Sequence, residues 1–103
     1  IAVGVDDESI LKAINLVVHE KGGISCVQGV SSKVIGLPVA GLMSTADPYQ
    51  VANDYIEIDK MAKSLGTQLG SPFMTLSFMA LLVIPHIKMS DLGLFDGDQF
   101  KLY

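Results

Sequence analysis

The chain has 103 residues, of which 50% are hydrophobic and 17% charged, and its formal net charge is −4. All seven basic residues are lysines, and a chain without arginine forks or a basic run is a poor candidate for binding nucleic acid or an anionic membrane. The length predicts a single domain over residues 1–103. No signal-peptide pattern is present, so a cytoplasmic location is the default expectation. Because a strand pattern begins at once at Ile1, we expect a fragment of a longer protein.

The apolar content exceeds what so short a chain can bury. A domain of this size removes only about two-thirds of its unfolded surface from water, and the mean hydropathy is +0.46. Contiguous exposed apolar patches usually mark interfaces. We therefore expect a partner surface to which Leu42, Met43 and residues 87–95 contribute, and self-association of the chain by itself.

The N-terminal part predicts a strand followed by a helix. Residues 1–5 (IAVGV) form a short apolar strand pattern. The acidic run that begins at Asp6 suits a helix N-terminus, and Gly22 marks the end of that helix. Glu8 and Lys12 are spaced for an i,i+4 ion pair on the outside. The predicted buried stripe consists of Leu11, Ile14 and Val18, with Ile10 and Val17 on its flank.

Two more strands are predicted at residues 24–28 and 33–37, joined by a polar connection of hairpin length at residues 29–32. The next segment, PVAGLMS at residues 38–44, is apolar but contains both proline and glycine. It therefore suits neither an ordinary strand nor a surface loop.

The pattern at residues 48–65 predicts a capped helix. Asp47 is an N-cap, a proline occupies the first helical position, and Gln50 completes a variant of the capping box. Asp59 and Lys63 are spaced to pair on the outside. The stripe that should face the sheet consists of Val51, Tyr55, Ile58, Ala62 and Leu65.

Residues 73–84 contain only two polar side chains, so we expect this run to be buried in either of two backbone conformations. The alternation of apolar residues with Thr75 and Ser77 is typical of a strand. A serine N-cap followed by Pro72, with apolar residues at helical spacing, is typical of a helix, which we favour. The run is too short to span a membrane, which takes about 20 apolar residues.

The C-terminal segment mixes apolar residues with turn residues. This spacing predicts an irregular wrap over residues 87–95 and a short terminal strand at residues 100–103. Taken together, the elements predict an α/β (α+β-like) fold, a small single domain with one mixed sheet, packed helices and an irregular C-terminal wrap.

Four contiguous segments resemble the C-terminal domain of bacterial adenine deaminases, in the amidohydrolase superfamily. They are LPVAGLMS at residues 37–44, PFMTLSFMAL at 72–81, VIP at 83–85 and KMSDLGLFD at 88–96. Together they cover roughly a third of the chain. Long contiguous segments of this kind identify a family more specifically than single residues at a fixed spacing do. Leu82 stands where that family usually has proline, and His86 where it usually has glutamate.

The resemblance implies a parent enzyme of purine salvage that hydrolyses adenine to hypoxanthine and ammonia. It also implies that the metal-binding histidines and acidic residues lie in a separate barrel domain, absent from this chain, which would hold manganese, iron or zinc. The implied partners are that barrel and, in addition, further copies of the protein in a homo-oligomer.

No residue set in the chain matches a catalytic, cofactor-binding or metal-binding pattern, and we predict none of these sites here. Each of the two histidines, His19 and His86, lacks neighbours at ligand spacing. We expect His19 to be solvated at a helix C-terminus and His86 to make a structural hydrogen bond. The aspartates lack the residue order of a calcium loop and indicate turns instead; they are Asp91, Asp96 and Asp98.

The remaining reactive residue types also have structural explanations. The single cysteine, Cys26, fits a small buried hydrophobic residue on a strand. No serine lies in a G-x-S-x-G context, and no phosphate-binding glycine loop occurs. The methionines indicate core or interface packing. The serines are Ser44, Ser77 and Ser90, and the methionines are Met43, Met74, Met79 and Met89.

Two functional hypotheses follow. The first is a non-catalytic C-terminal domain of adenine deaminase that packs on the metal-bearing barrel. The second is a free-standing small α/β interaction or ligand-binding module without enzymatic activity. An independent enzyme has only His86 and Asp91 in its favour, and we discount it.

Overall fold

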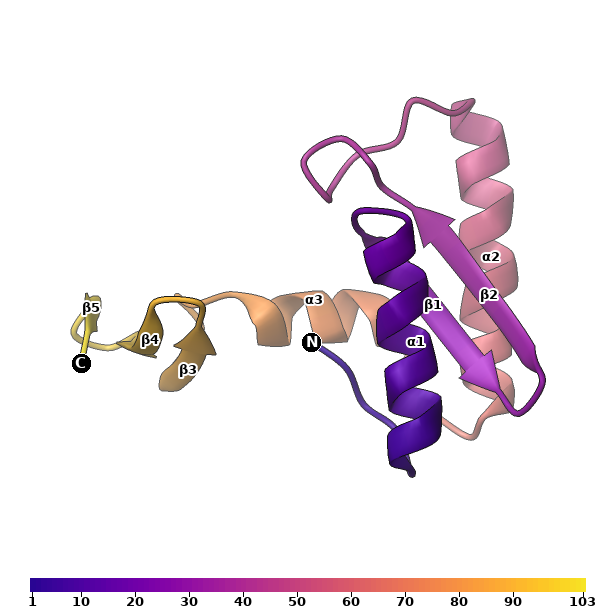
Figure 1. The fold of residues 1–103 in the computed structure, drawn as a ribbon. Coiled ribbons are helices and arrows are strands. Elements are labelled where there is room, and N and C mark those ends of the chain that lie inside the picture. Colours follow the sequence, from indigo (N-terminus) through magenta and orange to yellow (C-terminus); the bar gives the residue numbers. More distant parts are fainter. The chain divides into compact units, whose positions relative to one another are not determined.

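The computed structural model describes residues 1–103, and the chain forms two compact units. One unit comprises residues 2–72, and the other comprises residues 73–103 together with Ile1. The elements in chain order are α1 (Asp7–His19), β1 (Gly23–Gln28), β2 (Ser31–Gly36), α2 (Pro48–Ser64), α3 (Pro72–Ala80), β3 (Ile87–Ser90), β4 (Gly93–Asp96) and β5 (Lys101–Leu102) (Figure 1).

The predicted mixture of helices and strands is confirmed, but the predicted single mixed sheet is wrong. The strands form two antiparallel sheets, β1–β2 and β3–β4–β5. Each sheet is built from strands that are neighbours in sequence, because short turns allow antiparallel pairing without a crossover. None of the helices combines the length and apolar character needed to cross a bilayer.

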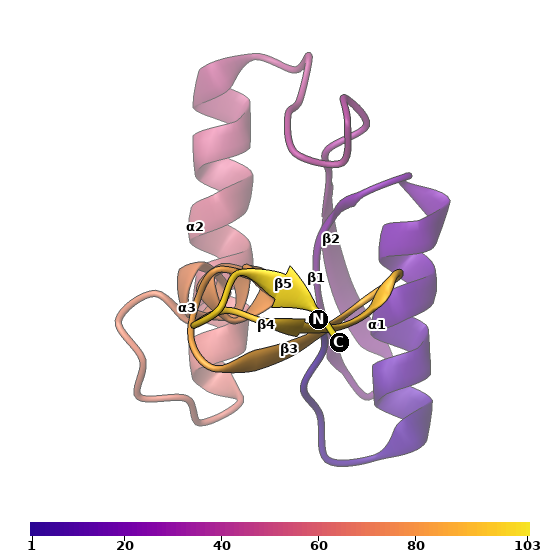
Figure 2. The same cartoon turned by 90° about the vertical axis from the view of Figure 1, so that its left-hand side faces the viewer.

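In the unit of residues 2–72, helices α1 and α2 cover opposite faces of the β1–β2 hairpin (Figure 2). The register places Gln28 opposite Ser31, so the turn is formed by two residues. Side chains alternate between the two faces of a strand. Cys26 and Ile35 therefore lie on the α2 face, where they form the core with the fully buried Ile58.

Helix α1 begins where the sequence predicts, but it buries a different side. The Asp6 carboxylate accepts a 2.7 Å hydrogen bond from the backbone N–H of Ser9, which caps the helix. The three central residues of the predicted stripe are exposed, whereas its flank residues Ile10 and Val17 are half-buried, as predicted. The hydroxyl of Ser25 on β1 bonds to the carbonyl of Ala13 and so directs this flank toward the sheet. The exposed fractions are 58% for Leu11, 43% for Ile14 and 67% for Val18.

Lys12 does not pair with Glu8 as predicted. Its ammonium group instead donates to the backbone carbonyls of Gly29 and Val30, at 3.1 and 3.4 Å. The lysine thus ties α1 to the tip of the β1–β2 hairpin, because a turn leaves carbonyl groups without partners in the ladder.

The predicted strand at residues 1–5 is also wrong. This segment has no strand partner, and the Val5 side chain is fully exposed. An apolar alternation forms a strand only where a neighbouring strand satisfies its backbone groups.

Helix α2 confirms the prediction for residues 48–65 almost throughout. The Asp47 carboxylate caps the helix by accepting from the backbone N–H of Tyr49 at 3.0 Å and of Gln50 at 3.2 Å. The side chain of Gln50 donates forward to Asp54 and does not close a capping box. The predicted ion pair is present, and four of the five stripe residues turn inward; Leu65, at the C-cap, is 49% exposed.

The run at residues 73–84 is helical over α3, as we favoured, but its predicted burial is wrong for most of its length. Phe73 is buried, whereas the exposed fractions are 53% for Met74, 51% for Phe78 and 53% for Val83. A helix that is apolar on all sides needs neighbours on all sides to be buried. Within α3 only Pro72 and Phe73, at the start of the helix, are buried.

The predicted irregular wrap is instead a regular hairpin. Strands β3 and β4 pair with Ser90 opposite Gly93, which leaves Asp91 and Leu92 as the turn. The predicted terminal strand is confirmed as β5, which pairs with β4. The rings of Phe95 and Phe100 pack edge to face with centroids 5.3 Å apart, which stabilises this small sheet.

Candidate functional site

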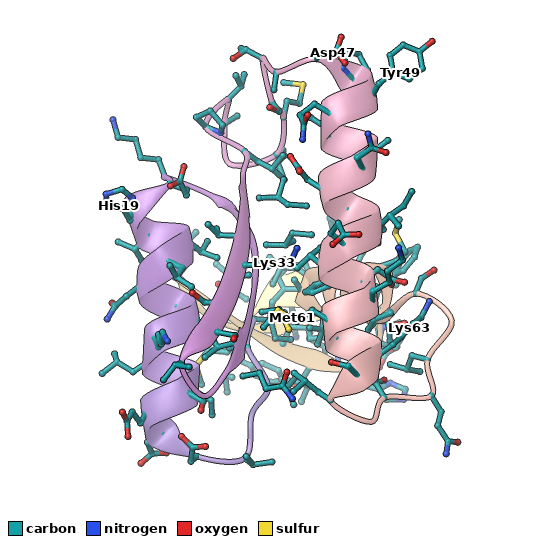
Figure 3. The ribbon with its side chains drawn as sticks, turned by 90° about the vertical axis from the view of Figure 1, so that its right-hand side faces the viewer. His19, Lys33, Asp47, Tyr49, Met61 and Lys63 are labelled. Carbon is teal, nitrogen blue, oxygen red and sulfur yellow. The ribbon has the colours of Figure 1, made fainter.

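The two histidines lie in local pairs. His19 ends α1, where its Nδ1 lies 3.3 Å from a carboxylate oxygen of Glu20, and its side chain is 86% exposed. Figure 3 shows His19 at the end of its helix, apart from the other labelled side chains. The His86 Nδ1 lies 2.6 Å from Oδ2 of Asp98, which is the hydrogen bond expected for this histidine. His19 and Glu20 are adjacent in sequence, whereas His86 and Asp98 lie 12 residues apart, and the side chains of both pairs are open to solvent.

Asp96 is the buried polar residue of the chain, with 5% of its surface exposed. Its Oδ1 accepts from the backbone N–H groups of Asp98 at 2.9 Å and of Gln99 at 2.8 Å. Its Oδ2 accepts from the hydroxyl of Tyr103 at 3.1 Å. The N–H of Gln99 is the main cause that holds the pKa of Asp96 below its usual range. This carboxylate therefore organises a turn.

The metal-ligand residue types do not gather in the structure. No group of three or more His, Cys, Asp or Glu side chains lies close enough together to hold a metal ion. The oxygens of Asp96 are engaged by protein donors, and Asp91 lies in the β3–β4 turn.

Cys26 and the serines have the structural roles that the sequence indicates. Cys26 is buried on β1, and burial raises the pKa of its thiol, which disfavours the reactive thiolate. The hydroxyl of Ser44 accepts from the N–H of Ala46, and that of Ser77 donates to the carbonyl one helical turn before it. The hydroxyl of Ser90 holds the β3–β4 turn through two hydrogen bonds.

A depression between β2 and α2 has no counterpart in the sequence-based predictions. It encloses about 180 Å³ and is lined by Lys33, Val34, Ile35, Asp54, Glu57 and Ile58. The ammonium group of Lys33 lies 3.2 Å from a carboxylate oxygen of Glu57. This hydrogen bond makes the largest contribution to lowering the pKa of Glu57. No sequence spacing signals the pair, because Lys33 belongs to β2, where Figure 3 labels it, and Glu57 belongs to α2. Pockets for small molecules usually measure about 300–1,000 Å³, so this depression is too small.

The loop between β2 and α2 presents apolar side chains to solvent, as predicted for Leu42 and Met43. Their exposed fractions are 77% and 57%. The loop is nonetheless ordered by backbone hydrogen bonds between Val39 and Met43. Exposed apolar side chains on a fixed loop can bind a partner, and this loop is the best-formed candidate for an interaction site.

Comparison with known proteins gives one consistent result. The family described as the adenine deaminase C-terminal domain matches residues 1–101. The adenine deaminase of Sulfurovum sp. (strain NBC37-1) is 52% identical over 101 residues, which are 97% of this chain and 19% of that protein. The adenine deaminase of Methanosarcina acetivorans is 52% identical over 103 residues, covering 98% of this chain and 18% of that protein.

A third relative, the adenine deaminase of Borreliella afzelii, is 45% identical over 101 residues, covering 97% of this chain and 18% of that protein. The chain thus spans about a fifth of the length of the curated relatives it matches. No solved structure matches it significantly. The family match over nearly the whole chain shows that this chain belongs to the adenine deaminase C-terminal domain family.

Proposed function

We propose that this chain acts as a non-catalytic C-terminal domain in an enzyme that hydrolyses adenine to hypoxanthine and ammonia. The observation that carries the proposal is the 45–52% identity, over nearly the whole chain, to three proteins named adenine deaminase. A free-standing module is the weaker alternative, because each of these relatives carries the matching segment within a chain about five times as long.

The chemistry supports a non-catalytic role. Hydrolytic removal of an amino group from a purine needs an activated water, which a bound divalent metal ion supplies in metal-dependent deaminases. A catalytic site of this kind takes about three protein ligands. The side chains here do not fit, because no three His, Cys, Asp or Glu side chains lie close enough together to hold an ion, and both oxygens of Asp96 accept from protein donors. The proposal therefore assigns the manganese, iron or zinc ion to the barrel domain outside this chain.

We also infer where the enzyme acts and which surfaces the domain contacts. A role in purine salvage predicts a cytoplasmic location. The expected partners are the barrel of the same chain and further copies in a homo-oligomer. The exposed apolar residues of α1, α3 and the β2–α2 loop support a domain that is covered by other protein surfaces.

The test compares the full-length parent protein with residues 1–103 alone. Each is incubated with adenine and added manganese, iron or zinc, ammonia release is measured, and bound metal is determined by elemental analysis. We expect turnover and stoichiometric metal only in the parent. Turnover by residues 1–103 that is abolished in His86→Ala, or stoichiometric metal in this chain, would overturn the non-catalytic assignment. An inactive parent would overturn the proposed reaction.

A further inference from the structure

The loop that carries Leu42 and Met43 has a fixed backbone. The N–H of Val39 donates to the carbonyl of Met43, and the N–H groups of Leu42 and Met43 both donate to the carbonyl of Val39, each at 3.1 Å. Between them, Ala40 and Gly41 have positive φ angles of 57° and 74°. These hydrogen bonds close a tight turn whose shape depends on left-handed backbone.

The same loop is held against the end of α1. A methyl group added to Gly22 would collide with the backbone of Gly41, so the two glycines pack with no side chain between them. The N–H of Leu37 donates to the carbonyl of Gly22 at 2.9 Å and anchors the start of the loop. The loop is thus fixed at its base and at its tip.

This fixed loop presents apolar side chains outward. Leu42 is 77% exposed and Met43 is 57% exposed. A binding element that is already ordered loses little conformational entropy when its partner covers it. Leu42 supplies an aliphatic side chain that can be buried in a partner's pocket, and the flexible side chain of Met43 can adapt to an irregular surface beside it.

We propose that Leu42 and Met43 form a preorganised docking knob that inserts into an apolar pocket on the part of the adenine deaminase chain that precedes this domain. The inference rests on the proposed function and deepens it by naming the surface that joins the domain to the rest of the enzyme. In the relatives, about four-fifths of the chain lies outside the matching segment, so a partner surface of ample size is available.

The size of the knob favours this occupant over a second copy. A stable interface between separate molecules buries about 800 Å² per partner, far more than two side chains offer. A contact within one chain needs less area, because the covalent link keeps the partners at an effective concentration near the millimolar range. A small apolar knob is therefore sufficient for an intramolecular interface.

The experiment uses the full-length parent protein. Leu42 and Met43 are both replaced by glutamine, and the matched control is Val30→Gln at the tip of the β1–β2 hairpin, where the valine is 97% exposed. Limited proteolysis measures the rate at which the 11.0 kDa domain is released, and calorimetry counts the unfolding transitions. We expect about tenfold faster release in the double variant, equivalent to about 1.4 kcal/mol of lost coupling, and two transitions in place of one.

A second variant, Gly41→Val, tests preorganisation, because valine strongly disfavours the positive φ at this position. It should also release the domain faster while leaving Leu42 and Met43 in place. Release rates equal to that of Val30→Gln in both variants would overturn the docking role. A halved molecular mass in light scattering with unchanged release would assign the knob to a second copy and overturn it too. Adenine turnover by the unmodified parent is measured separately, so failure of the proposed reaction is distinguishable.

Discussion

The hydroxyl of Tyr103 donates a 3.1 Å hydrogen bond to Oδ2 of Asp96. This contact joins the last residue of the chain to the end of β4, next to the hydrogen bond from the N–H of Tyr103 to the carbonyl of Leu94. The bond is the main cause that raises the pKa of Tyr103 above its usual range. The pKa of Asp96 is lowered chiefly by the N–H of Gln99, and the bond from Tyr103 adds to this effect.

The Asp96 turn predicts acid sensitivity. A group whose pKa is lowered by folding contributes stability above its unfolded pKa of about 3.9, and this contribution is lost as the pH falls through the folded value. Denaturant titrations of Asp96→Asn and of the unmodified chain should therefore differ at neutral pH and converge as the pH falls through the lowered pKa of the folded state. Asp91→Asn, in the exposed β3–β4 turn, serves as the control. Equal midpoints for Asp96→Asn and the unmodified chain at neutral pH would refute the prediction.

The cap of α2 predicts a measurable loss on truncation. Asp47→Ala removes the acceptor of two backbone N–H groups, and the free energy of unfolding should fall by about 0.5–2 kcal/mol. Asn53→Ala, on the exposed side of the same helix, should change it by less than about 0.5 kcal/mol. Chemical denaturation of both variants provides the comparison, and equal effects would argue against a capping role.

The core under α2 predicts a contrast between two isoleucines of the same helix. Ile58 is fully buried, whereas Ile56 is 50% exposed. Ile58→Ala should cost about 2–5 kcal/mol of stability, because it removes buried methyl groups and leaves a cavity. Ile56→Ala should cost much less. Denaturation midpoints of the two variants measure the difference, and similar values would show that this helix buries another face.

Gly97 predicts a steric requirement. A methyl group at this position would lie 3.1 Å from the carbonyl oxygens of His86 and Leu82, and the N–H of Gly97 donates to His86 at 2.7 Å. Gly97→Ala should therefore destabilise the chain by about 1–3 kcal/mol. Gly70→Ala has open space around the added methyl and is the control. Unchanged thermal stability in Gly97→Ala would show that this turn tolerates a side chain.

The exposed stripe of α1 predicts association of the isolated chain. Replacement of Leu11 and Val18 by glutamine should reduce the apparent mass in light scattering without loss of stability, because more than half of each side chain already contacts water. Ile10→Gln, which places a polar group on the face toward the sheet, should instead lower stability. Unaltered association in the double variant would remove the stripe as an interface.

Local chemistry alone determined several features. Helix α2 starts at the predicted residue and ends within one residue of its predicted end. Its bounds follow from the cap at Asp47, the proline after it and the helical repeat of apolar residues, all of which act between residues less than two turns apart. The helical start at Pro72 and the exposure of Leu42 and Met43 were likewise predictable. The family resemblance came from contiguous segments, which need no three-dimensional information.

Tertiary structure decided which surfaces are buried and which strands pair. Apolar residues occupy more than one side of α1, so the sequence does not determine which side of the helix faces the sheet. In the structure, the hydrogen bonds from Ser25 to Ala13 and from Lys12 to the hairpin tip fix that orientation. Tyr103 bonds to Asp96, seven residues away, and His86 bonds to Asp98, twelve residues away. Neither separation is the hydrogen-bonding spacing of a helix or a tight turn, so the sequence pattern does not predict these contacts. Residues 1–5 have the alternation of a strand but no partner. Helical hydrogen bonds form within one segment, whereas burial and strand pairing depend on a second segment whose position only the folded chain defines.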